Sequence, residues 1–147
     1  MAEVVKALGI FGYPLAHSMS HLMYSTAIKH LGINFQFQPY EVKPEHLPAA
    51  VEGVRAMGIR GVCVTIPHKG AIIPLLDELT EDARLMRAVN VVCLEDGERL
   101  VGHNTDGIGF VTSMRKDVGQ DPKGKRILLL GAGGAAKAIA VKLAVEG

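Results

Sequence analysis

Short apolar runs alternate with longer segments of helical periodicity along the chain. Residues 4–12 are mostly apolar and end at a glycine, and residues 19–32 then repeat apolar positions at helical spacing before a second glycine. The alternation continues through the sequence. It predicts strands over residues 4–12, 35–42, 60–66, 89–94, 98–102 and 126–130, and helices over residues 19–32, 44–58, 105–119 and beyond a glycine turn at 131–134.

Two other segments complete the predicted fold. Residues 67–88 are expected to form two short helices, because Pro74 breaks the first and Thr80 can cap the second. Residues 95–97, Glu-Asp-Gly, indicate a hairpin turn between two strands. Repeated strand–helix units with one antiparallel piece predict an α/β fold: a largely parallel sheet with helices on both faces and one antiparallel hairpin. Residues 126–147 have the pattern that opens a dinucleotide-binding unit, which is a strand, a glycine turn and a helix.

The composition narrows the classes of function. The chain has 147 residues, enough for one domain of ordinary size, with 16 basic against 15 acidic residues. Aromatic residues make up 5%, so neither charge nor stacking favours nucleic acid as a partner. The first residues show neither a signal peptide nor an apolar run long enough for a membrane span, and we expect a cytoplasmic protein. Cys63 and Cys93 lie in apolar, strand-like runs, which suits free thiols in a reducing compartment.

Polar loops follow several of the predicted strands. Sheets of this kind bind ligands at the carboxyl ends of their strands, so these loops are the candidates for a site. They occupy residues 13–21, 65–70, 88–90 and 102–107.

The first loop carries two serines at the start of a helix. Ser18 stands at the expected N-cap and Ser20 lies in the first turn, where capping alone would explain them. Two hydroxyls at the positive end of a helix also make a site for a carboxylate. His17 and His21 are four residues apart, but no third ligand has a suitable spacing, so we expect a solvent-facing pair and no metal site.

The second loop ends a buried strand at Thr65 and presents Lys69 at the start of a helix. An ammonium group is misplaced there by up to about 1 kcal/mol, which hints at a role in proton transfer. An exposed lysine with no function is the alternative. In the last two loops, Asn90 is an amide inside an apolar run and needs a partner, while Asp106 either caps a helix or faces a ligand.

Taken in order, five motifs resemble shikimate dehydrogenases: GYPLAHSMSHLMYSTA, GVCVTIPHK, RAVNVV, GHNTDGIGF and LLLGAGGAAKA. The glycine turn alone would be weak evidence, but five ordered motifs are specific. In that family an amino-terminal domain binds shikimate and a carboxyl-terminal Rossmann domain binds NADP. The resemblance covers the whole first domain and the first βα unit of the second. It implies NADP-dependent, reversible reduction of 3-dehydroshikimate to shikimate in aromatic amino acid (chorismate) biosynthesis.

The resemblance also implies a division of the chain. Residues 1–110 would be the shikimate-binding catalytic domain, 111–124 a connecting helix and linker, and 125–147 the start of the NADP-binding Rossmann domain. A single strand and helix cannot cover each other's apolar faces. We therefore expect a fragment that is inactive alone and binds no NADPH measurably. Its tail, from about Lys125, is expected either to pack against a second copy of the chain, as a homodimer, or to be held by neighbours in a crystal.

The family's substrate residues transfer onto matching positions. Ser18 and Ser20 would bind the substrate carboxylate, and Lys69 would be the catalytic acid and base, with Asp106 orienting the reacting hydroxyl and keeping Lys69 in place by charge. The residues implied to bind the ring hydroxyls are Thr65, Asn90 and Asp106.

The cofactor residues transfer in the same way. Backbone amides of the glycine turn would face the pyrophosphate, and Glu81 matches an acidic position near the cofactor. The residues of that turn are Gly131, Ala132, Gly133, Gly134 and Ala135. The residue that separates NAD from NADP normally lies about 20 residues beyond the turn, outside this sequence.

Two positions depart from the family pattern. Cys63 stands where the family usually has Asn, so one hydroxyl contact is lost or replaced, since a thiol is a weak donor. His21 stands where the family has Pro, which should alter rigidity more than chemistry. Two alternatives remain open: a relative that also acts on quinate, and a non-catalytic shikimate-binding module. Lys69 and Asp106 weigh against the module, because binding alone needs no proton-transfer pair.

Overall fold

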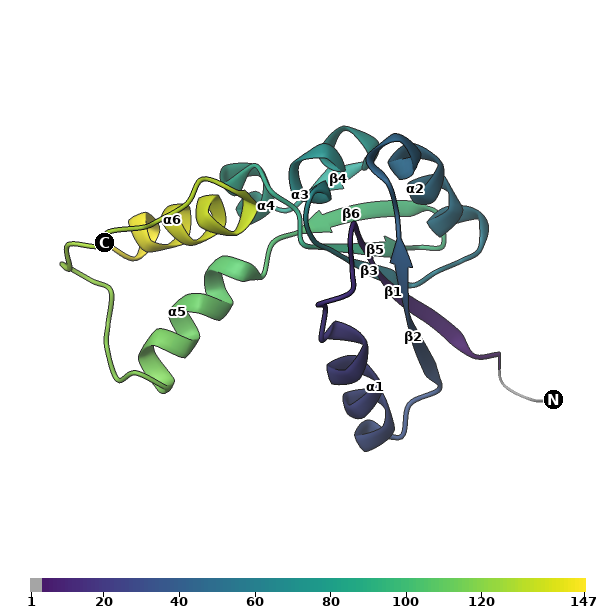
Figure 1. Ribbon diagram of the computed structural model, residues 1–147, viewed down its shortest axis with the longest axis horizontal. Helices are drawn as coiled ribbons and strands as arrows, with labels where there is room; N and C mark the ends of the chain where they lie inside the picture. The colour runs from purple at the N-terminus through teal and green to yellow at the C-terminus, as the bar shows by residue number, and fades with distance from the viewer. Residues whose placement is uncertain (1–3) are drawn as a thin grey trace.

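A six-stranded sheet forms the centre of the computed structural model, which describes residues 4–147 (Figure 1). The strands lie in the order β2-β1-β3-β5-β6-β4. β5 is antiparallel to both of its neighbours, and the other pairs of adjacent strands are parallel. The predicted parallel sheet with one antiparallel hairpin is therefore confirmed. The strands are β1 Lys6–Gly12, β2 Phe35–Glu41, β3 Gly61–Val64, β4 Glu78–Leu79, β5 Val91–Glu95 and β6 Arg99–His103.

The hairpin joins β5 to β6 through a tight turn. Asp96 has φ 52° and Gly97 has φ 80°, and the Glu98 N–H donates to the Glu95 carbonyl at 3.1 Å. Positive φ at both central residues is the turn whose twist matches that of antiparallel strands. The Asp-Gly pair thus sets the register in which Val91 lies opposite His103.

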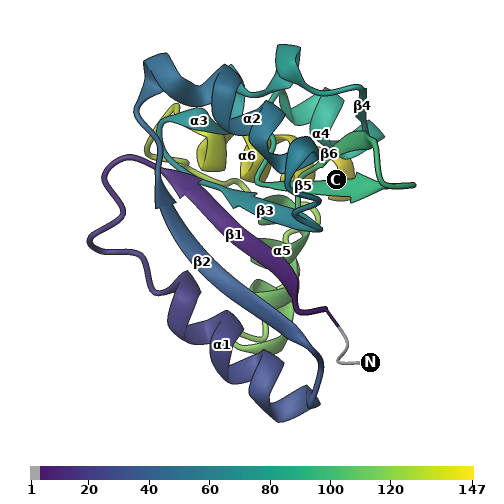
Figure 2. The ribbon, with the colours of Figure 1, turned by 90° about the vertical axis from the view of Figure 1, so that its right-hand side faces the viewer.

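Helices cover both faces of the sheet, as predicted (Figure 2). On one face, α1 (Ser20–Leu31) packs over β1 and β2 with a small cluster of Ile10, Leu15 and Phe37. The other face carries the larger core. It is covered by η1 Pro44–His46, α2 Leu47–Ala56, α3 His68–Ala71, η2 Ile73–Leu75 and α4 Glu81–Met86. The helix predicted at 44–58 is split, because its first turn is a 3₁₀ turn and the α-helix proper starts at Leu47, with Pro48 in its first turn.

The strand predicted at residues 126–130 is not formed. These residues have no pairing partner in the described chain, and Leu128 and Leu130 are 85% and 86% exposed. An extended segment becomes a strand only when a neighbour accepts its hydrogen bonds, and the apolar pattern alone could not supply that neighbour. The two-residue strand β4 was not predicted, because it is too short to show a periodicity.

The last helix, α6 (Gly134–Glu146), packs against α5 (Asp106–Lys116) and α4 (Figure 1). Arg115 of α5 reaches Glu146 of α6 at 2.5 Å. Within the chain, α6 thus packs against α5 and α4. The expected homodimer stays a prediction. The expected boundary after residue 110 lies within α5, and residues 117–133 then lead to α6.

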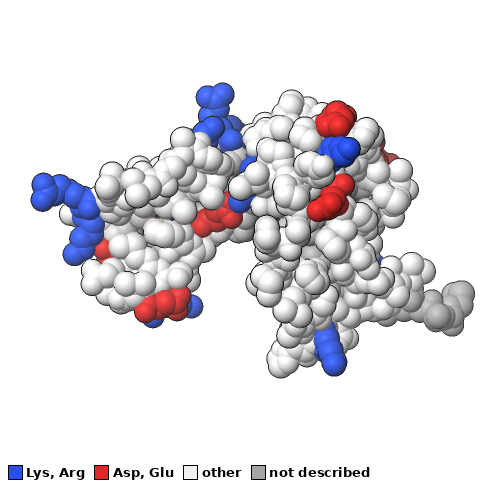
Figure 3. Space-filling model, viewed as in Figure 1, with Lys and Arg blue, Asp and Glu red and all other residues white. Residues whose placement is uncertain are grey.

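The surface carries both signs of charge. On the face shown in Figure 3, Lys and Arg side chains are dispersed and Asp and Glu lie among them, without a continuous basic stripe. No helix within residues 4–147 combines the length and the apolar character that crossing a membrane requires.

Two glycines of α5 give a matched test of how α6 is seated. A β-carbon at Gly107 would lie 2.8 Å from Lys142 Cβ and 2.9 Å from the Ala138 carbonyl oxygen, whereas one at Gly109 would meet nothing within 4 Å. We expect Gly107→Ala to lower the free energy of unfolding by about 1–3 kcal/mol through overpacking. Gly109→Ala should raise it by about 0.5–1 kcal/mol through helix propensity. Urea denaturation measures both, and equal effects would contradict the close packing of α5 on α6.

Candidate functional site

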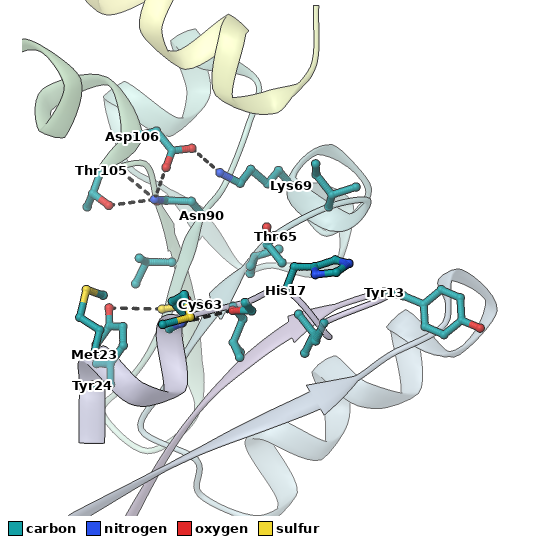
Figure 4. Close-up of a pocket in the computed structure, with 18 of the residues that line it drawn as sticks. Tyr13, His17, Met23, Tyr24, Cys63, Thr65, Lys69, Asn90, Thr105 and Asp106 are labelled. Carbon is teal, nitrogen blue, oxygen red and sulfur yellow. Dashed lines mark hydrogen bonds and ion pairs between the residues drawn. The ribbon is translucent and has the colours of Figure 1, made fainter. Parts of the chain in front are cut away.

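A cavity of about 690 Å³ opens where β1, β3 and β6 end and β5 begins (Figure 4). Its wall comes from the loop after β1, the start of α1, the segment from β3 to α3, and the start of α5. The six residues predicted to bind substrate all line it: Ser18, Ser20, Thr65, Lys69, Asn90 and Asp106.

The two serines lie at the start of α1, but the helix begins one residue later than predicted. Met19, not Ser18, is the N-cap residue, and Ser20 is the first residue of the helix. The Ser18 hydroxyl oxygen accepts the Ser20 N–H at 3.3 Å, and the Ser18 N–H donates to the Leu15 carbonyl at 2.8 Å. The loop is thus folded back on itself, and both serine side chains border the cavity.

Lys69 and Asp106 form an ion pair within the cavity wall (Figure 4). Their side chains are 13% and 23% exposed, which excludes the alternative that Lys69 is a free surface lysine. The other carboxylate oxygen of Asp106 accepts a hydrogen bond from Asn90 Nδ2 at 2.9 Å. The same nitrogen donates to Thr105 Oγ1, and Asn90 Oδ1 accepts the Thr105 N–H, both at 2.9 Å. Asn90 therefore finds its partners in the protein, and it holds the β6–α5 turn and the carboxylate in one arrangement.

Asn104 holds the backbone on which this arrangement depends. It was not among the residues predicted from the sequence. It is 5% exposed, and its Nδ2 donates to the Ala88 carbonyl at 2.9 Å while its Oδ1 accepts the Asp106 N–H at 3.0 Å. Both ends of the amide are used, so its loss would free the backbone of Asp106. The sequence offered one signal for Asn104, which is an amide residue between a predicted strand and a predicted helix.

His68 was also missed, although it precedes Lys69. It is 1% exposed, and its Nε2 lies 2.7 Å from the Val42 carbonyl, so Nε2 carries the proton that bridges α3 to the end of β2. This bond fixes the helix that carries Lys69. Its role depends on a residue 26 positions away, which no local pattern indicates.

A second cavity of about 590 Å³ lies on the other side of Lys69. Thr65, Ile66 and Lys69 line one side, and Gly133, Gly134 and Ala135 line the other. A β-carbon at Gly134 would lie 3.0 Å from Lys69 Cβ, so the glycine allows α6 to approach the lysine stem. Lys69 thus borders both cavities.

The remaining predicted cofactor residues lie outside that second cavity. Gly131 has φ 130°, a conformation that favours glycine, and Ala132 follows it. Glu81 is exposed in the first turn of α4, where Thr80 caps the helix by accepting the Ala83 N–H, and it lines neither cavity. Within residues 4–147, no three His, Cys, Asp or Glu side chains gather in a way that could hold a metal ion.

This fold and site define an α/β domain with a polar cavity at the carboxyl edge of its sheet, beside a glycine-rich helix start. Residues 10–92 match the family model described as the shikimate dehydrogenase substrate binding domain. The chain belongs to that family, and the resemblance seen in its motifs is confirmed.

Known relatives agree with this assignment. A shikimate dehydrogenase (NADP(+)) of Geobacter metallireducens is 54% identical over 97% of this chain and 49% of its own length. A crystal structure of shikimate dehydrogenase in complex with NADP+ matches with a TM-score of 0.91 at 44% identity, over 95% of this chain and 48% of that one. The ligand-free 5-ketofructose reductase of Gluconobacter sp. strain CHM43 matches with a TM-score of 0.88 at 40% identity, over 99% of this chain and 52% of that one. The chain spans about half the length of the relatives it matches.

Asn104→Ala tests the support beneath Asp106. The substitution leaves the Ala88 carbonyl buried without its donor, and we expect a loss of about 1–3 kcal/mol in the free energy of unfolding. Thr112→Ala, at an exposed position of α5, should change it by less than about 0.5 kcal/mol. Urea denaturation provides the measurement, and equal stability of the two variants would show that the Asn104 bonds are not needed.

Proposed function

We propose that this chain provides the substrate-binding and proton-transfer part of an NADP-dependent shikimate dehydrogenase, which interconverts 3-dehydroshikimate and shikimate. The observation that carries the proposal is the position of Lys69. It borders both cavities, one lined by the serines and the other by the glycine turn, and it is paired with Asp106. A proton-transfer group between a ligand cavity and a cofactor cavity suits oxidation of a hydroxyl.

We assign the substrate carboxylate to Ser18 and Ser20. Their hydroxyls border the cavity at the start of α1, where the helix field favours a negative group. Thr65, Asn90 and Asp106 lie on the β3 and β5 side of the same cavity and are assigned to the ring hydroxyls. Placing an anion at one end and hydroxyl-binding groups at the other orients an asymmetric ring.

Lys69 is assigned the proton. When shikimate is oxidised, the neutral amine of Lys69 accepts the proton of the reacting hydroxyl as the hydride leaves the carbon that bears this hydroxyl. When the ketone is reduced, the ammonium returns a proton to the carbonyl oxygen. Asp106 keeps the lysine nitrogen on the cavity side, because the carboxylate is itself held by Asn90 and by the backbone turn over Asn104.

The glycine turn suits the phosphates of a dinucleotide. Gly133 and Gly134 begin α6 without a side-chain cap, and a β-carbon at Gly133 would meet nothing within 4 Å, so a phosphate can approach the first amides. Bound there, NADP accepts or supplies the hydride. We assign the binding of the dinucleotide phosphates to Gly131, Ala132, Gly133, Gly134 and Ala135. Glu81 is assigned a position near the same cofactor.

The domain division is also a proposal. Residues 1–110 would form the shikimate-binding catalytic domain, 111–124 the connecting helix and linker, and 125–147 the start of the NADP-binding domain. Ile127, Leu128 and Leu130 expose apolar side chains that further strands or a second copy of the chain would cover. Cys63 and Cys93 are free thiols, which supports the proposal that the protein is located in the reducing cytoplasm.

A second candidate is reduction of another polyol ketone, since the Gluconobacter relative is named as a 5-ketofructose reductase. Cys63 also stands where the resemblance implies a hydroxyl-binding Asn. Calorimetric titration of the 147-residue chain with shikimate, quinate and 5-ketofructose separates the candidates. We expect heat from shikimate, because the residues assigned to it lie together in one cavity.

The same titration tests the carboxylate site. Ser18→Ala combined with Ser20→Ala should weaken shikimate binding at least about tenfold, since hydrogen bonds to a charged group are lost. Ser25→Ala is the control, because Ser25 is exposed on α1 and does not line the cavity. No measurable shikimate binding by the parent chain at millimolar concentration would refute the proposed function.

Lys69 requires an assay of turnover. Residues 1–147 can be joined to the carboxyl-terminal half of the Geobacter metallireducens relative to complete the cofactor domain. In this chimera Lys69→Ala should lower kcat by about 10²–10⁴-fold, the usual contribution of general acid–base catalysis, with a smaller change in KM. Lys29→Ala, exposed on α1, is the control. A kcat within a few fold of the parent would remove Lys69 from the mechanism.

A further inference from the structure

Tyr24 and Cys63 form a hydrogen-bonded pair in the cavity wall, away from Lys69 and Asp106 (Figure 4). The Cys63 sulfur lies 3.3 Å from the Tyr24 hydroxyl oxygen, and both residues line the cavity. Neither is needed for the proton transfer described above. Cys63 lies in β3 at the position where family members usually carry Asn, and Tyr24 comes from α1 on the adjacent wall.

The phenol of Tyr24 is firmly placed. Its ring stacks on Phe37 of β2, with centroids 4.4 Å apart and planes inclined by 5°. The ring also belongs to the small core between α1 and the sheet, together with Ile28 and Leu8. Stacking at one end and the sulfur contact at the other keep the hydroxyl at the cavity rather than in solvent.

Both groups keep their protons near neutral pH. The hydrogen bond with Cys63, followed by burial, raises the pKa of Tyr24 to about 12. Burial raises the pKa of the Cys63 thiol, more than the Tyr24 hydrogen bond lowers it. The pair therefore has two hydrogens, and the bond between the two side chains uses one of them. Either group can donate in that bond, because both carry a hydrogen. The phenol donates to the sulfur when no ligand is present, which raises its pKa, and the thiol donates to the Tyr24 oxygen when an acceptor in the cavity takes the hydroxyl hydrogen.

We propose that Tyr24 is a substrate-binding residue of this chain, and that its hydroxyl donates to a ring oxygen of the substrate where other members use the Asn amide. The inference rests on the proposed function. A phenol fixed by stacking donates well but offers its oxygen to the thiol, whereas an amide both donates and accepts. The cavity is thus selective for an acceptor oxygen at this point.

Calorimetry with shikimate tests this inference. Tyr24→Phe keeps the ring stacked on Phe37 and removes only the donor, so shikimate should bind about five- to tenfold more weakly, the effect of one hydrogen bond. Tyr40→Phe is the matched control, because Tyr40 packs edge-on against Phe11 and does not line this cavity. Adding Cys63→Asn to Tyr24→Phe should restore much of the affinity by returning an amide donor.

A second readout reports contact with the ligand directly. In protein labelled with ¹³C at tyrosine Cζ, the resonance that disappears in Tyr24→Phe belongs to Tyr24, and it should shift when shikimate is added. Parent and Tyr24→Phe chains that bind shikimate equally, with no such shift, would overturn the inference and leave the proposed function intact. A parent chain that binds no shikimate would instead overturn the proposed function, and this inference with it.

Discussion

The half-buried carboxylate of Asp106 must be compensated, and the surrounding structure does this with groups from three separate parts of the chain. Lys69 supplies the charge from α3, Asn90 supplies an amide from the start of β5, and the Asn104 side chain accepts the backbone N–H of Asp106 itself. A carboxylate left without these partners would carry a large desolvation cost. The ends of β3, β5 and β6 are therefore held together by the same groups that form the site, and packing and chemistry are not independent here.

This coupling explains which site residues were accessible to sequence reasoning. Ser18, Thr65, Lys69, Asn90 and Asp106 each follow or precede a predicted strand, and strand ends in such a sheet meet at one edge. Their meeting in one cavity followed from the strand pattern. His68 and Tyr24 could not be found in this way, because each acts through a partner far along the chain, Val42 for His68 and Cys63 for Tyr24.

The fold shows the same division between local and distant determinants. The Asp-Gly turn, the Thr80 cap and the glycine that ends α1 in a left-handed conformation are local signals, and the structure contains all three. The segment 126–130 has strong strand character in its sequence, yet it forms no strand, because pairing is a property of two segments and not of one. α6, in contrast, packs on α5 and α4 within the chain, and Arg115 of α5 pairs with Glu146 of α6.

Because β5 runs antiparallel to its neighbours, its start lies at the cavity and the turn that follows it lies at the opposite edge of the sheet. A strand that runs backward brings its start, with Asn90 just before it, to the edge where its neighbours end, and so contributes to the cavity. Its own turn, at residues 95–98, is consequently sent to the opposite rim of the sheet. That turn lines neither cavity, and Asp96, Gly97 and Glu98 are exposed. It offers an attachment point for a fluorophore or an affinity tag that leaves the ligand-binding edge untouched.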